Sequence, residues 1–168
     1  MKKETKNIAT TINEYLGNTK AVIIDNGDTI TKISDDEFEL ENTIKFLTKH
    51  PDVFPIIYNI KDNVIEMEKL NVEKAEKEFK ILDKLFKWKL NIWFKHYLMR
   101  DYTYLLIYPN KSYPVIPPDF PSEYNDVIDR YQKLIDNIMK IVGKRFLLDV
   151  HSKNFGYDKN GTLKMFDI

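Results

Sequence analysis

The sequence predicts an α+β fold in which a β-rich part, residues 1–70, precedes a mostly helical part, residues 71–168. Short runs of β-branched residues joined by tight-turn signals occupy the first part, which is typical of antiparallel strands. Long segments with apolar residues at three- and four-residue spacing occupy the second part, which is typical of amphipathic helices. An apolar–turn–apolar pattern near the end predicts a β-hairpin.

The composition limits the class of protein. A chain of 168 residues with 43% hydrophobic residues can bury a core, as one domain or as two small units around a cleft. The 26 basic residues balance the 26 acidic ones, so we expect neither a nucleic acid nor an anionic membrane as a partner. The absence of cysteine excludes disulfides and thiolate metal sites and fits a reducing compartment.

The beginning of the chain, Met1-Lys-Lys-Glu-Thr-Lys, lacks the apolar run of a signal peptide. No window approaches the roughly 18 apolar residues of a membrane span. We therefore expect a cytoplasmic protein. The abundance of Lys, Asn, Ile and Asp is compatible with an AT-rich coding sequence such as a phage gene, in which case the compartment would be the host cytoplasm.

The β-rich part begins with a predicted hairpin. Residues 21–25 form a short apolar strand, Asn26-Gly27-Asp28 is a tight-turn signal, and residues 29–33 alternate as the partner strand. Ser34, Asp35 and Asp36 are alternative N-caps for a helix that reaches about Lys49. Its predicted inner face carries Phe38, Ile44 and Leu47. Residues 54–58 and 63–67 read as two more strands, joined by a turn at 61–63 and preceded by a loop between Pro51 and Pro55.

The helical part begins at Asn71, a candidate N-cap. The long helix that follows has an apolar face of Val72, Ala75, Phe79, Leu82 and Phe86. Residues 88–97 add Trp88, Trp93, Phe94 and Tyr97 between lysines. These aromatic residues could form core, or they could present an exposed face to a partner protein.

Further along, residues 102–108 could be a strand or the end of the helical region, and five of the seven prolines make 109–121 an extended connector. Ser122 is the predicted cap of the next helix, and Gly143 its predicted end. The apolar stripe of this helix is Val127, Tyr131, Leu134, Ile138 and Ile141. Apolar residues at 155–157 and 162–166 flank Asp158-Lys-Asn-Gly161, which predicts the final hairpin.

One polar pattern carries chemistry. Asp149-Val-His-Ser-Lys-Asn154 precedes the hairpin, and Asp167 follows it. Phosphoryl transfer needs such a set, because one carboxylate orients the attacking hydroxyl while an amide and a second carboxylate hold Mg²⁺ on the phosphates.

The order of elements and this motif resemble the protein-kinase-like superfamily, including its aminoglycoside and choline kinase branches. The catalytic loop of those branches reads roughly D-L-H-x-x-N and precedes a hairpin and a metal-binding Asp. The resemblance implies a bilobal fold, with a small antiparallel β N-lobe carrying one helix and a truncated, mostly helical C-lobe ending in a β-hairpin. It also implies that Asp149 is the catalytic base and that Asn154 and Asp167 bind Mg²⁺.

The same resemblance implies a nucleotide site. Lys32 would contact the ATP phosphates and pair with a helix glutamate, for which Glu41 fits best and Glu39 is the second candidate. Met67 would be the gatekeeper, and the Glu68 carbonyl and Leu70 amide would face adenine. The alternative is that Lys32 and Glu41 are ordinary surface charges.

Two features depart from the family pattern. Gly17 stands alone where the family has a glycine-rich loop, and it could equally be an ordinary turn glycine. Leu147 and Leu148 replace the His and Arg of regulated kinases, and only Ile168 follows Asp167, so by this resemblance we expect a lobe without the activation segment and the rest of the helices.

The sequence therefore predicts a minimal kinase-like phosphotransferase that binds Mg-ATP and transfers the γ-phosphate to a hydroxyl acceptor. The alternative is a catalytically inactive, kinase-derived binding module (a pseudokinase) that binds or inhibits a partner protein.

Overall fold

The computed structural model describes residues 21–99, 115–143 and 148–168. Within these ranges the chain has an α+β fold, which confirms the predicted class. The strands are β1 (Val22–Asp25), β2 (Thr29–Ile33), β3 (Ile57–Lys61), β4 (Val64–Glu68), β5 (Phe155–Tyr157) and β6 (Leu163–Met165). The helices are α1 (Glu37–Lys45), α2 (Val72–Leu90), α3 (Phe94–Leu98) and α5 (Asn125–Val142), with 3₁₀ turns at Leu47–Lys49 and Ser122–Tyr124.

Strands β1 to β4 form an antiparallel sheet in the order β1-β2-β4-β3. The predicted hairpin turn is confirmed, because the Asn26 N–H donates to the Thr29 carbonyl at 2.9 Å. The strand predicted at 54–58 instead begins at Ile57. Phe54 is fully buried and its N–H donates to the His50 carbonyl, while Pro55 has no N–H to offer a strand partner.

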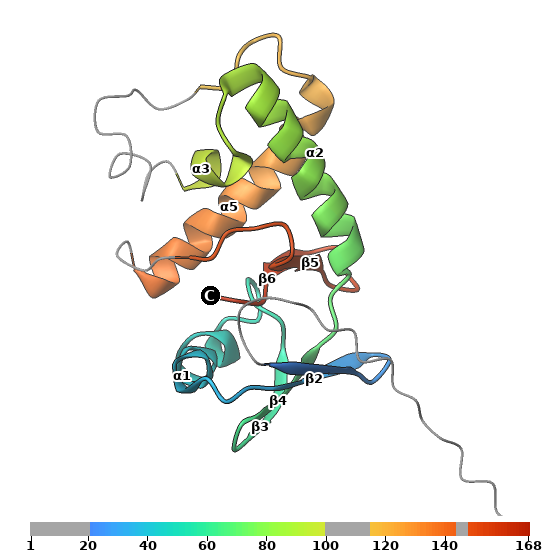
Figure 1. The fold of residues 1–168 in the computed structure, drawn as a ribbon, viewed down its shortest axis with the longest axis vertical. Coiled ribbons are helices and arrows are strands. Elements are labelled where there is room, and N and C mark those ends of the chain that lie inside the picture. The colour runs from blue at the N-terminus through green and yellow to red at the C-terminus, as the bar shows by residue number, and fades with distance from the viewer. Residues whose placement is uncertain (1–20, 100–114, 144–147) are drawn as a thin grey trace, which may run out of the picture.

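Figure 1 shows the sheet and α1 at one end of the molecule and α2, α3 and α5 at the other, with the β5–β6 hairpin between them. The chain passes from the sheet to α2 at Asn71, which lies beside β5. The Asn71 N–H donates to the Tyr157 carbonyl at 2.7 Å, and the Tyr157 N–H donates back at 3.2 Å. The hairpin is therefore attached to the segment that joins the sheet to the helices.

The N-cap of α1 is Asp36, one of the three predicted candidates, and its carboxylate accepts from the Phe38 and Glu39 N–H groups. The helix ends at Lys45 rather than at about Lys49, because residues 47–49 form a 3₁₀ turn. Its predicted inner face is partly wrong, because Phe38 and Ile44 are 63% and 54% exposed, whereas Leu47 is buried. The face turned inward carries two polar residues, Asn42 and Thr43. A helix rotated in this way brings polar groups against the C-terminal segment, and the Asn42 amide contacts the Ile168 carbonyl at 3.5 Å.

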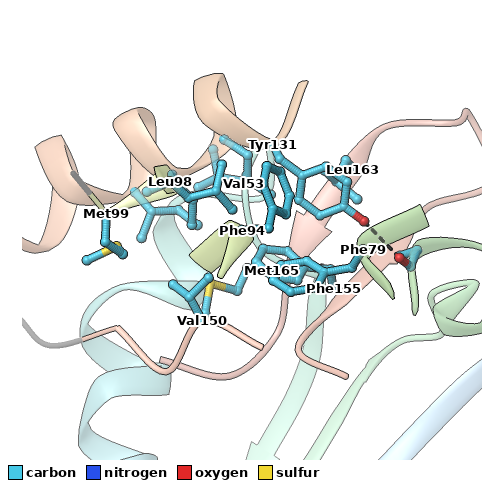
Figure 2. Close-up of a cluster of buried hydrophobic side chains, with 14 of the residues drawn as sticks. Val53, Phe79, Phe94, Leu98, Met99, Tyr131, Val150, Phe155, Leu163 and Met165 are labelled. Atoms are coloured by element: carbon cyan, nitrogen blue, oxygen red, sulfur yellow. Dashed lines mark hydrogen bonds between the residues drawn. The ribbon is translucent and has the colours of Figure 1, made fainter. Parts of the chain in front are cut away.

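The core lies mainly between α2, α5 and the hairpin (Figure 2). Phe79 of α2 stacks on Phe155 of β5 at 5.6 Å between ring centroids, and Tyr131 of α5 meets Phe155 edge-on at 5.1 Å. The Tyr131 hydroxyl donates to the Ala75 carbonyl at 2.9 Å, so its polar end is satisfied inside the core. Val53 belongs to the same cluster and precedes β3. One continuous core therefore joins the two ends of the molecule.

Helix α5 differs from prediction only at its start. Ser122 does not cap it, because residues 122–124 form a 3₁₀ turn and α5 begins at Asn125. Gly143 ends the helix as predicted, with φ of +94°. The stripe is confirmed at Tyr131, Leu134 and Ile138, which are buried. Predictions for 102–108 and for the first part of the proline-rich connector lie outside the described residues.

Gly156 of β5 lies directly against Leu70, in the segment leading to α2. A Cβ atom at this position would lie 2.5 Å from the Leu70 Cβ. We therefore expect Gly156→Ala to lower the free energy of unfolding by about 1–3 kcal/mol through overpacking. Urea unfolding of the variant measures this loss.

The Leu70→Gly background is the matched control, because it removes the Cβ that the new methyl group at position 156 would meet. There, the additional cost of Gly156→Ala should fall below about 0.5 kcal/mol. An equal cost in both backgrounds would show that the contact with Leu70 is not the cause.

Candidate functional site

Lys32 lies on the central strand β2, paired with Ile23 of β1 and Ile65 of β4. Its ammonium group is buried and forms an ion pair with Glu39 of α1. The Ser34 hydroxyl donates to the other carboxylate oxygen of Glu39 at 2.6 Å. A buried lysine needs such a partner, because an unpaired charge away from water is strongly unfavourable. The pair therefore fixes the lysine beneath α1.

The prediction that Glu41 pairs with Lys32 is wrong. Glu41 is exposed on α1, and Glu39, the second candidate, makes the contact. Glu39 and Glu41 are two positions apart, which on a helix places them about 200° apart around the axis. Only one of the two side chains can therefore face β2. The rotation of α1 that buries Asn42 and Thr43 also selects Glu39.

Asp167 approaches the same lysine from the C-terminal segment. Its carboxylate lies 4.0 Å from the Lys32 ammonium, and its side chain is 36% exposed. The Phe166 N–H donates to the Asn154 carbonyl at 3.1 Å, which holds Asp167 next to the loop that contains Asn154. Asp167, which is distant in sequence, therefore lies next to the Lys32–Glu39 ion pair.

The loop from Asp149 to Asn154 is held by its own hydrogen bonds. The Asn154 side-chain amide, which is buried, donates to the Asp149 carbonyl at 2.8 Å, and its backbone N–H donates to the His151 carbonyl at 3.1 Å. His151 Nδ1 accepts from the Lys153 N–H, and Nε2 lies 3.2 Å from the Asp149 carboxylate. The Asp149 side chain itself is 72% exposed, so a molecule in solution can reach it.

The surroundings of Asp167 disfavour its negative charge. Burial raises the pKa of the Asp167 carboxyl above its usual value, and the nearby Glu39 and Asp149 carboxylates raise it further. Lys32 and His151 act in the opposite direction without cancelling this effect. The ionised form of Asp167 is therefore disfavoured in the protein alone. An added positive charge at the carboxylate would relieve the repulsion.

The donor set is small. In the ranges that the structure covers, no group of three or more His, Asp or Glu side chains could hold a metal ion. The two residues that the sequence motif assigns to Mg²⁺ are Asp167 and Asn154, and the structure brings them near each other through the bond from the Phe166 N–H to the Asn154 carbonyl. Such a pair fits Mg²⁺, which typically takes one or two protein ligands and completes its octahedron with phosphates and water.

The three residues predicted near adenine lie at the end of β4 and just after it. Met67 is buried on β4, paired with Ile30 of β2. The Glu68 N–H donates to the Ile56 carbonyl at 2.8 Å, and Leu70 is buried against Gly156. Contacts of Glu68 and Leu70 with adenine stay predictions. Gly17 lies outside the described residues.

Sequence reasoning missed a buried charge cluster next to this segment. The Lys164 ammonium of β6 lies 2.8 Å from the Glu68 carboxylate and 3.3 Å from that of Asp158. Glu68 also accepts from the Ile56 N–H at 3.1 Å. The sequence carries no signal for this cluster, because a lysine between Leu163 and Met165 reads as the exposed position of an alternating strand.

The aromatic residues at 88–97 divide into two groups. Phe94 and Tyr97 are buried in the core, whereas Trp88 and Trp93 are 75% and 44% exposed. A break separates Trp88 from the other three: α2 ends at Leu90, Asn91 adopts a left-handed conformation, and α3 begins at Phe94. Each tryptophan carries a lysine ammonium over its ring, Lys89 at Trp88 and Lys87 at Trp93.

Comparisons with known proteins give no relative: no protein-family model matches the chain, and neither a curated protein nor a solved structure matches it. Of the helices that the structure describes, none has the length and apolar character required to cross a membrane.

Proposed function

We propose that the chain is a minimal kinase-like phosphotransferase with a bilobal arrangement, in which Mg-ATP binds between the sheet and the β5–β6 hairpin. The observation that carries the proposal is the meeting of the Lys32–Glu39 ion pair with Asp167, 4.0 Å from the lysine. A buried lysine held by a helix glutamate, beside an aspartate that disfavours its own negative charge, is suited to bind an anionic phosphate together with its cation.

Each residue has a role in this proposal. Lys32 neutralises phosphate oxygens, and the Glu39 carboxylate keeps the ammonium group in place. The Asn154 amide oxygen and the Asp167 carboxylate would hold Mg²⁺. When bound, Mg²⁺ would neutralise charge on the β- and γ-phosphates. Met67, Glu68 and Leu70 would line the adenine side of the site.

Asp149 would act on the acceptor. Its exposed carboxylate accepts a hydrogen bond from the acceptor hydroxyl and takes its proton. The hydroxyl oxygen forms a bond to the γ-phosphorus while the bond to the β–γ bridging oxygen breaks, and ADP leaves. His151, 3.2 Å from the Asp149 carboxylate, holds that carboxylate toward the acceptor.

The test is turnover with water as the acceptor. The wild-type protein with ATP and Mg²⁺ is expected to release ADP slowly, and Asp149→Asn should lower this rate about 100-fold or more, because general-base catalysis contributes roughly 10²–10⁴. Binding of Mg-ATP should change less than about threefold, because in this proposal Asp149 contacts the acceptor rather than ATP. Equal ADP release by the two proteins would contradict the role of Asp149.

A second function is favoured by one observation. Trp88 and Trp93 are exposed, and tryptophan is enriched among the residues that dominate protein–protein binding. A kinase-derived binding module that engages a partner protein through residues 88–97 would use this surface. Retention of Mg-ATP binding without any ADP release would favour this binding module over the phosphotransferase.

A further inference from the structure

We propose that Ser34 is a positioning residue for the nucleotide site: its buried hydroxyl fixes the Glu39 carboxylate, and through it the Lys32 ammonium, toward the phosphates. This inference rests on the proposed function. It extends that function to a residue for which, within the described ranges, no contact with Asp167, Asn154 or Asp149 is found. Ser34 follows directly after β2, so it is attached to the same strand as the lysine that it helps to orient.

The Ser34 hydroxyl is engaged both as a donor and as an acceptor. Ser34 is 2% exposed, and its single O–H donor is directed to Glu39 Oε2 at 2.6 Å. Its oxygen accepts from the Asp36 N–H at 3.2 Å, and its own backbone N–H donates to the Asn63 carbonyl at 3.0 Å. Ser34 therefore has a fixed backbone and a fixed hydroxyl direction.

The two oxygens of Glu39 are divided between two partners. Oε1 pairs with the Lys32 ammonium and Oε2 accepts from Ser34. A carboxylate with both oxygens engaged has one orientation, whereas a carboxylate held on one side only can rotate about its terminal torsion, which is broad. Because Glu39 and Asp167 are also close enough to repel, an unrestrained Glu39 could draw Lys32 away from the phosphate position. The hydroxyl prevents this movement.

Helix capping does not explain the hydroxyl. The N-cap of α1 is Asp36, and its carboxylate already accepts from the Phe38 and Glu39 N–H groups. Ser34 lies two residues before that cap; its oxygen accepts from the N–H of Asp36 itself, while its hydroxyl hydrogen is directed to the Glu39 side chain. Its bond is a charge-assisted one inside the protein, the class that contributes most among hydrogen bonds.

The experiment measures the dissociation constant of Mg-ATP for the full chain by calorimetry. Ser34→Ala is expected to weaken binding about tenfold, the lower part of the range for a hydrogen bond to a charged group. The matched control is Thr43→Val, which removes a buried hydroxyl on α1 that is bonded at 2.9 Å to the Glu39 backbone carbonyl instead of its carboxylate. The control should bind within about twofold of the wild-type protein, since backbone bonds leave the carboxylate orientation unchanged.

A double-mutant cycle separates positioning from general destabilisation. In the Glu39→Ala background the hydroxyl has no carboxylate to orient, so Ser34→Ala should change Mg-ATP binding less than about twofold. Ser34→Thr, which keeps the hydroxyl, should restore most of the affinity. If Ser34→Ala does not fold, Ser34→Cys, with a similar shape and a weak donor, is compared in the same cycle.

The outcomes are distinct. A wild-type protein that binds no Mg-ATP overturns the proposed function and, with it, this role of Ser34. If the wild-type protein binds, then equal binding by Ser34→Ala overturns the positioning role alone. The same is true of a loss that persists undiminished in the Glu39→Ala background.

Discussion

Replacement of Lys164 by Met is expected to lower the free energy of unfolding by about 3–5 kcal/mol, the cost of removing one partner from a buried ion pair. The Lys164 and Glu68 side chains are only 4% and 9% exposed, so solvent cannot compensate for the lost charge. Asp158 would keep hydrogen bonds from the Asn160 and Thr162 N–H groups. Of the hydrogen bonds that the described residues make to the Glu68 carboxylate, the one from the Ile56 N–H would remain. The uncompensated charge is therefore that of Glu68.

Urea denaturation at neutral pH measures this loss. Two variants serve as controls: Lys164→Met combined with Glu68→Gln, which removes both charges and should recover a large part of the stability, and Lys159→Met in the exposed hairpin turn, which should change it by less than about 0.5 kcal/mol. A Lys164→Met variant within about 1 kcal/mol of the wild-type protein would mean that the buried pair is not holding β6 to β4.

Replacement of Asp167 by Asn is expected to have opposite effects on stability and on nucleotide binding. Mg-ATP binding should weaken ten- to 100-fold, because a charged ligand is lost. The protein without nucleotide should become more stable at neutral pH, because the pKa of the Asp167 carboxyl is raised by burial and by the neighbouring Glu39 and Asp149 carboxylates. Binding sites often lower the stability of the protein without its ligand, because groups arranged for binding are unfavourable when the ligand is absent.

The sign of the pH dependence follows from this raised pKa. The folded protein holds the Asp167 proton more tightly than the unfolded chain does, so the free energy of unfolding falls as pH rises from the unfolded value, about 3.9, through the folded one. The stability gained by Asp167→Asn should therefore be complete at neutral pH and disappear at more acidic pH. Thermal melts from pH 3 to 7 test this.

The control for this pH dependence is Asp149→Asn, the same chemical change at a carboxylate that is 72% exposed, which should shift the melting temperature little. A lower melting temperature for Asp167→Asn at neutral pH would contradict the electrostatic account.

Local patterns in the sequence were sufficient to predict most of the helices, strands and turns. The turn at 26–28, the Asn71 cap, the α5 stripe and the Gly143 end each depend on residues close together in the chain, and the structure has them as predicted. The rotation of α1 could not be predicted in this way. Its buried face carries Asn42 and Thr43, so a hydrophobicity pattern indicates the wrong side and, with it, Glu41 in place of Glu39.

In the candidate site, too, local features could be predicted from the sequence, and the packing of one element against another could not. The motif from Asp149 to Asn154 and the hairpin after it are local, so the sequence indicates that Asp167 returns toward Asn154. A contact that joins distant segments, such as Lys164 with Glu68, leaves no periodic signal. The bond between Ser34 and Glu39 joins residues only five positions apart, but it depends on the rotation of α1, which the hydrophobic pattern does not indicate. Both contacts depend on how the hairpin and α1 pack against the sheet, which the residues around each position do not determine.

The most direct test of the proposed site is a calorimetric titration of ATP into the full chain, with Mg²⁺ and with EDTA, beside Asp167→Asn. We expect one ATP per chain, bound at least tenfold more tightly with Mg²⁺, and a loss of this dependence in the variant. Nucleotide at about 100 times its dissociation constant should then stabilise the wild-type fold by about 2.7 kcal/mol. If the folded wild-type protein binds no ATP, or binds it equally without Mg²⁺ and in the variant, Lys32, Asn154 and Asp167 do not form a Mg-nucleotide site.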